Sequence, residues 1–167
     1  MREAISDTGP ILHLYEINRL ETLQIFEQLF LPSMVAEELR LYGMDPLDLG
    51  GEVRVCVVPV SEQNRTEVLA EEGGFLIHPA DAEVFVLSRE DGFKMSVLTD
   101  DLALRRRLEM HGTVVTGSVG VLVRAYRTGL LQRDSLEIAV DALFDESTLH
   151  LSHAFRVYVR QLLADLP

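Results

Sequence analysis

Short apolar runs alternate with stretches of helical periodicity along most of the chain, and this alternation constrains the fold more than any other feature. Strands that alternate with helices indicate βαβ units, in which a parallel sheet is covered by helices on both faces. We therefore predict an α/β fold of three layers, α/β/α, with a short parallel central sheet. The expected strands are residues 4–6, 30–33, 96–99 and 113–115, with a further strand on an exposed edge around residues 53–57.

Apolar residues at helical spacing mark the segments between and after these runs. The chain of 167 residues is most simply one domain. We predict a main α/β domain over residues 1–130 and a C-terminal helical extension over 131–167, packed on the same domain. The expected helices are residues 11–15, 20–26, 33–42, 61–72 ended by Gly73-Gly74, 79–90 opened by Pro79, 104–112, 118–126, 135–144 and 152–164.

Charge and cysteine content narrow the class of protein. The net charge is −12, and it arises entirely in residues 1–100, which hold 19 acidic against 7 basic residues. This argues against a protein that coats nucleic acid through a general basic surface. The single Cys56 excludes an internal disulfide, and no apolar segment is long enough to span a membrane. We expect a cytoplasmic protein with no membrane partner.

The triplet Asp7-Thr8-Gly9 follows the first expected strand and allows two interpretations. It is the signature of aspartic proteases, but that fold is almost entirely β and builds its site from two such loops. In a parallel α/β sheet, sites form at the carboxyl ends of the strands, where Asp7 and the pair Asp100-Asp101 fall. Acids in such turns also cap the following helix, so capping remains an alternative for each of them.

Two helical acids favour a shared site over isolated caps. Glu38 lies on the helical face of Val35 and Tyr42, and Glu83 lies in an otherwise apolar helix. A carboxylate on such a face needs a cation or strong donors. Several acids at one sheet edge suit Mg²⁺ or Mn²⁺, which activate water and neutralise phosphate charge. The neighbouring acids Glu37 and Asp81 are expected on other helix faces, in solubility or capping roles, and His13 as a surface or satisfied histidine.

Several segments, in order, resemble PIN-domain proteins, the nuclease fold of many toxin ribonucleases in toxin–antitoxin pairs. Each is moderately specific, and their order and spacing strengthen the resemblance. The segments are Ser6-Asp7-Thr8-Gly9-Pro10-Ile11-Leu12, residues 31–39 with an acid just before Leu39, residues 79–84, Val97-Leu98-Thr99-Asp100-Asp101 with Arg105-Arg106, and residues 116–122.

The resemblance implies a metal-dependent endoribonuclease, in which water activated by Mg²⁺ or Mn²⁺ attacks the phosphodiester. It also implies a homodimer and a possible antitoxin partner. The acidic first hundred residues and the C-terminal helices depart from a typical toxin nuclease. They leave open an alternative, a catalytically weak or inactive PIN-like module that binds protein or RNA. The resemblance places the catalytic acids at Asp7, Glu38, Glu83, Asp101 and Asp100, the metal ligands at Asp7, Glu83, Asp101 and Asp100, and substrate contacts at Ser118, Arg105 and Arg106.

Overall fold

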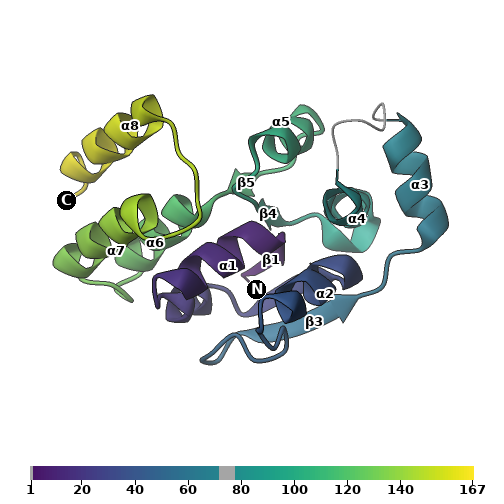
Figure 1. Ribbon diagram of the computed structural model, residues 1–167, viewed down its shortest axis with the longest axis horizontal. Helices are drawn as coiled ribbons and strands as arrows, with labels where there is room; N and C mark the ends of the chain where they lie inside the picture. Colours follow the sequence, from purple (N-terminus) through teal and green to yellow (C-terminus); the bar gives the residue numbers. More distant parts are fainter. Residues whose placement is uncertain (1, 72–77) are drawn as a thin grey trace.

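The computed structural model describes residues 2–71 and 78–167, in which five parallel strands form one sheet in the order β3-β2-β1-β4-β5 (Figure 1). The chain starts at the centre of the sheet, builds outward to β3, and returns to add β4 and β5 on the other side. Helices flank the sheet, so the predicted three-layer α/β/α fold is confirmed. The strands are β1 (Glu3–Ser6), β2 (Gln28–Pro32), β3 (Arg54–Val58), β4 (Ser96–Leu98) and β5 (Val115–Thr116).

The central strand is apolar because both of its faces are covered. Ile5 is fully buried and pairs with Phe30 of β2 and Val97 of β4. β3 lies at the edge of the sheet, and its residues are partly exposed, in agreement with the alternating pattern around residues 53–57. Because all five strands run in one direction, the turns after β1, β4 and β5 lie at the same edge of the sheet.

The helices begin close to the predicted positions. The segment predicted as a helix over 20–26 is a 3₁₀ helix instead, η1, and a second 3₁₀ turn, η2, precedes β4. The predicted helix stop at Gly73-Gly74 lies outside the described residues. The elements are α1 (Thr8–Glu16), η1 (Leu20–Ile25), α2 (Ser33–Leu41), α3 (Glu62–Glu71), α4 (Pro79–Arg89), η2 (Asp91–Phe93), α5 (Leu102–Met110), α6 (Ser118–Arg127), α7 (Arg133–Asp145) and α8 (His153–Ala164).

The C-terminal helices lie on one side of the molecule with α6, and α3 and α4 lie on the other (Figure 1). The connection before α8 is joined to α1, since the backbone N–H of Thr148 donates to Glu16 at 2.8 Å. Arg133 at the start of α7 donates to the Leu163 carbonyl at 2.6 Å. Within the described residues, no helix is both long enough and apolar enough to cross a membrane.

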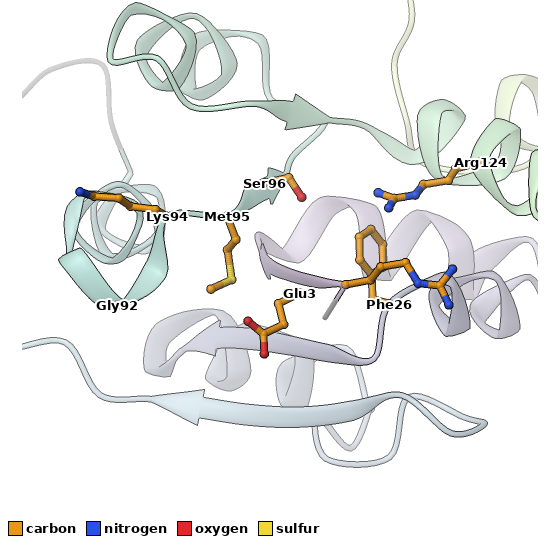
Figure 2. Close-up of a pocket in the computed structure, with 8 residues that line it drawn as sticks. Glu3, Phe26, Gly92, Lys94, Met95, Ser96 and Arg124 are labelled. Atoms are coloured by element: carbon orange, nitrogen blue, oxygen red, sulfur yellow. The ribbon is translucent and has the colours of Figure 1, made fainter.

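The two edges of the sheet differ in character. The carboxyl ends of the strands carry most of the predicted site residues. At the amino ends of β1 and β4 there is an open cavity of about 450 Å³ (Figure 2).

Candidate functional site

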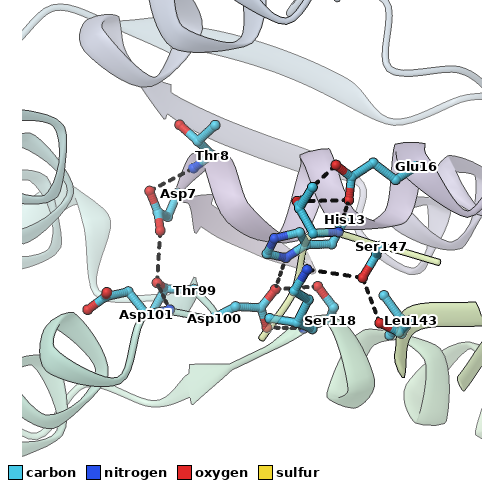
Figure 3. A network of polar contacts seen from close by, with 12 residues as sticks. Asp7, Thr8, His13, Glu16, Thr99, Asp100, Asp101, Ser118, Leu143 and Ser147 are labelled. Carbon is cyan, nitrogen blue, oxygen red and sulfur yellow. Dashed lines mark hydrogen bonds and ion pairs between the residues drawn. The ribbon is translucent and has the colours of Figure 1, made fainter. Parts of the chain in front are cut away.

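Asp7 occupies the first position after β1, at the centre of the carboxyl edge. It is the N-cap of α1, and its Oδ1 accepts a hydrogen bond from the Thr8 backbone N–H at 2.7 Å. Its Oδ2 accepts from the Thr99 hydroxyl at 2.9 Å (Figure 3). The residue is only 7% exposed. The predicted capping role is therefore present, but one carboxylate oxygen is directed across to the β4 turn.

Three more acids surround this position from other elements. Glu38 of α2 accepts a hydrogen bond from the Thr8 hydroxyl at 2.5 Å. Asp101 is the N-cap of α5, and its Oδ1 accepts from the Leu104 backbone N–H at 2.7 Å. Asp81 lies in the first turn of α4. We call Asp7, Glu38, Asp81 and Asp101 the acid cluster.

The charges of the acid cluster raise the pKa values of two of its members, Asp7 and Asp81, in addition to the effect of burial. Burial, followed by the charge of Asp81 and then that of Glu38, raises the pKa of Asp7 to about 7, against the lowering effect of its hydrogen bonds. Burial, followed by the charges of Asp101 and Glu38, raises the pKa of Asp81 to about 6. Repulsion of this kind is typical of carboxylates brought together for a function, although structural acids can show it too.

Asp100, next to Asp101, faces a different set of partners. Its Oδ2 lies 2.8 Å from His13 Nδ1 and also accepts from the Ser118 hydroxyl, while its Oδ1 accepts from the Ser118 backbone N–H at 2.8 Å (Figure 3). We call His13, Asp100 and Ser118 the Asp100 clamp. It joins α1, the β4 turn and the start of α6, and it satisfies His13, as the sequence suggested.

Both carboxylate oxygens of Glu83 have partners, in a network of polar contacts separate from the acid cluster. It is 1% exposed, and its Oε1 lies 3.0 Å from Nη1 of Arg65 on α3. Its Oε2 accepts from the backbone N–H of Met34 at 2.8 Å and from the Ser33 hydroxyl at 3.2 Å. The cation and donors that a buried acid requires are thus supplied by the protein. Glu83 ties α2, α3 and α4 together.

A family model described as a PIN domain matches residues 3–165, almost the whole chain. This chain belongs to the PIN-domain family. The fold is accordingly of nuclease type, and PIN nucleases typically use divalent metals. Neither a curated protein nor a solved structure matches the chain.

The donor chemistry of the acid cluster fits a divalent cation in this PIN domain. Carboxylate oxygens are the ligands that Mg²⁺ and Mn²⁺ prefer, and a cation would offset both the burial and the repulsion that raise the pKa values of Asp7 and Asp81. Among the residues that the structure describes, however, no three His, Cys, Asp or Glu side chains are close enough to hold a metal ion. The cluster therefore has suitable ligands that are not drawn together around one point.

Of the two arginines predicted to contact substrate, Arg105 makes contacts within the protein and Arg106 is exposed. Nη2 of Arg105 lies 3.3 Å from the Thr99 carbonyl oxygen, and its Nη1 lies 3.4 Å from that of Val115 and 3.5 Å from Glu109. Arg105 therefore supports the β4 and β5 turns. Arg106 is exposed on α5, about one turn beyond Asp101, and its side chain is accessible to a substrate.

Asp81 was expected on another face of its helix, in a solubility or capping role, and was not expected in the acid cluster. The carboxylate does cap, because its Oδ2 accepts from the His78 backbone N–H at 3.3 Å. One signal could have found it. Asp7, Asp81 and Asp101 all lie at an N-cap or in the first turn of a helix, the part of an α/β unit nearest the carboxyl edge. Glu83 lies further along α4, among its buried apolar residues.

Proposed function

We propose that this PIN domain is a metal-dependent endoribonuclease and that the acid cluster is its metal site. The observation that supports the proposal most is the presence of four acids from different elements at the carboxyl edge, two of them with raised pKa values. Asp7, Asp81 and Asp101 would hold Mg²⁺ or Mn²⁺, with Glu38 beside them. We assign neither Glu83 nor Asp100 as a ligand, because Arg65 pairs with the first and the Asp100 clamp engages the second.

A divalent cation bound here supplies the positive charge that activates water and neutralises the phosphodiester. Two threonine hydroxyls orient carboxylates of the acid cluster. The Thr99 hydroxyl orients Asp7 Oδ2, and the Thr8 hydroxyl orients Glu38. Thr99 also accepts from the backbone N–H of Asp101 at 3.1 Å, so one hydroxyl links Asp7 to the α5 turn.

RNA cleavage with and without metal tests this proposal. We expect purified protein to cleave RNA with Mn²⁺ or Mg²⁺ and to stop when EDTA is added. Asp7→Asn and Asp81→Asn should each lower the cleavage rate at least about a hundredfold, as loss of a key electrostatic group does. Glu37→Gln, an exposed acid beside Glu38, is the matched control and should cleave normally. If no divalent ion supports cleavage, the alternative of a non-catalytic binding module replaces the enzyme.

Arg106 is the proposed contact to the RNA backbone. A single phosphate contact adds affinity that is independent of base sequence and is weakened by salt. We predict that Arg106→Gln raises KM for RNA several-fold, leaves kcat nearly unchanged, and reduces the salt dependence of binding. Arg127→Gln on α6 provides the control. An equal loss in kcat would contradict a role limited to substrate binding.

The biological setting is proposed from family membership. We infer a cytoplasmic homodimer that acts as the toxin of a toxin–antitoxin pair, with residues 131–167 as its helical extension. Support for the dimer comes from α8, which exposes the apolar side chains of Phe155, Val157 and Tyr158. Light scattering tests the dimer, which should be present in the wild type and weakened in Tyr158→Asp. An inhibitory protein encoded beside this gene would support the toxin role.

A further inference from the structure

The cavity of about 450 Å³ lies at the amino-terminal edge of the sheet, across from the acid cluster. Arg2 immediately precedes β1, and Ser96 begins β4, whereas Asp7 and Asp101 follow the other ends of the same strands. The cavity volume is within the roughly 300–1,000 Å³ range of ligand pockets. Its location separates it from the proposed catalytic site.

Among the residues that line this cavity, Arg124 is the one held in place to bind an anion. Its guanidinium carbon lies 5.2 Å from the ring centroid of Phe26, a side chain that is only 2% exposed. Figure 2 shows the guanidinium extending from α6 toward Ser96. A cation packed against a buried ring loses little conformational freedom when it binds an anion. The stacking therefore pre-organises Arg124.

Three side chains at this edge, those of Arg2, Arg124 and Ser96, have donors without a partner among the described residues. Within residues 2–71 and 78–167, neither the guanidinium of Arg2 nor that of Arg124 makes a hydrogen bond or an ion pair, and the Ser96 hydroxyl makes no hydrogen bond. In a chain with 27 acidic and 15 basic residues, acids to pair with them are not scarce. Two arginines that line one cavity without a described partner favour an anion from outside.

The charge and shape of the surroundings point to phosphate. Among the described residues that line the cavity, Arg2 and Arg124 stand beside one acid, Glu3. The planar fork of a guanidinium matches phosphate oxygens, and it keeps its charge at any physiological pH. A neighbouring cavity of about 620 Å³ shares Lys94, Met95 and Ser96 with the first, which leaves room for the rest of a phosphorylated molecule.

We propose that this cavity binds the phosphate group of a nucleotide or of an RNA end, with Arg124 and Arg2 as the principal contacts and Ser96 as an additional donor. The site does not require the proposed nuclease activity, because it shares no residue with the acid cluster. The phosphate source is either a free nucleotide or the 5′ end of a strand.

Nuclear magnetic resonance titration of the full chain in EDTA and low salt tests the proposal without cleavage. The probes are adenosine 5′-monophosphate and a ten-nucleotide RNA with or without a 5′-phosphate. We expect saturable shifts of the Ser96 amide and the Arg124 Nε–H. Arg124→Gln and the exposed Arg2→Gln should each raise Kd at least about tenfold, the effect of a lost charged hydrogen bond. Arg127→Gln, on α6 but outside the cavity, should leave Kd unchanged.

The outcomes separate the phosphate sources. Tighter binding of the phosphorylated RNA than of the mononucleotide assigns the site to strand ends, and equal binding assigns it to free nucleotides. The proposal is overturned if no phosphorylated probe gives saturable shifts at Ser96 and Arg124. It is also overturned if the unphosphorylated RNA binds equally well, or if Arg127→Gln weakens binding as much as Arg124→Gln. Loss of RNA cleavage in Asp7→Asn without loss of this binding would show that the two sites are independent.

Discussion

The folded protein disfavours the charged form of the Asp7 carboxyl group. Its pKa rises from 3.8 to about 7 on folding, so between these values the folded protein holds the proton more tightly than the unfolded chain. The free energy of unfolding of the metal-free protein must then fall as the pH rises from about 4 to about 7. Asp81, with a pKa of about 6, adds to the fall over the lower part of this range.

We predict that Asp7→Asn raises the free energy of unfolding at pH 8 by on the order of 1–3 kcal/mol in EDTA, since one pKa unit is equivalent to about 1.4 kcal/mol. The gain should disappear near pH 4, where the wild-type carboxyl is protonated. Urea unfolding at the two pH values measures it. Glu37→Gln should show no such gain, and a wild type whose stability rises between pH 4 and pH 7 would contradict the account.

Gly117 packs closely against the Asp100 clamp. A Cβ at this position would lie 2.6 Å from Asp100 Oδ1, closer than packing allows, and 3.2 Å from Arg105 Nη2, which is a tight contact. We predict that Gly117→Ala destabilises the protein by about 1–3 kcal/mol, the usual cost of overpacking. Thermal unfolding measures the loss. Gly92→Ala, where a Cβ meets nothing within 4 Å, is the control and should be nearly neutral.

At the scale of elements, helices α3 and α4 are joined by two ion pairs of very different burial. Arg65 and Glu83 lie 3.0 Å apart, with the acid 1% exposed, while Arg89 and Glu71 lie 3.3 Å apart, with about half of each side chain exposed. A buried pair that loses one partner costs about 3–5 kcal/mol, and a surface pair contributes about 0–1 kcal/mol.

We therefore predict that Arg65→Met and Glu83→Gln are each strongly destabilising and that their double mutant is far from additive. The corresponding changes at Arg89 and Glu71 should each cost less than about 1 kcal/mol. Double-mutant cycles by urea unfolding compare the two pairs. If the Arg65–Glu83 pair had the same coupling energy as the Arg89–Glu71 pair, Glu83 would not depend on Arg65. Glu83 would then again be a candidate metal ligand.

Secondary structure was predictable because each element has a clear local pattern. Buried parallel strands are apolar on both faces, as at Ile5, and Pro79 marks a helix start where its missing N–H costs little. The 3₁₀ geometry of residues 20–25 was not predictable, because apolar spacing alone does not distinguish it from a short α-helix. The pairing of Glu83 with Arg65 was also beyond the sequence, because the two residues lie 18 positions apart on different helices.

At the scale of the whole molecule, opposite charges gather at opposite edges of one sheet. Four acids from the β1 and β4 turns and from α2 and α4 lie at the carboxyl edge, although Asp7 and Asp101 are 94 positions apart in the chain. Arg2, Lys94 and Arg124 line a cavity at the amino edge. The sequence predicted three members of the first group, Asp7, Glu38 and Asp101, from strand ends and family resemblance, and it expected Asp81 only as a solubility or capping residue. It could not predict the second, because the basic residues share no motif.

We propose that the acid cluster, with Asp81 as a ligand, binds a divalent cation. Calorimetric titration of Mn²⁺ at pH 7.5 into the wild type, Asp81→Asn and Glu83→Gln, each shown to be folded by circular dichroism, tests it directly. We expect one site in the wild type, at least about tenfold weaker binding in Asp81→Asn, and unchanged affinity in Glu83→Gln. No binding by the wild type, or a loss in Glu83→Gln with none in Asp81→Asn, would contradict it.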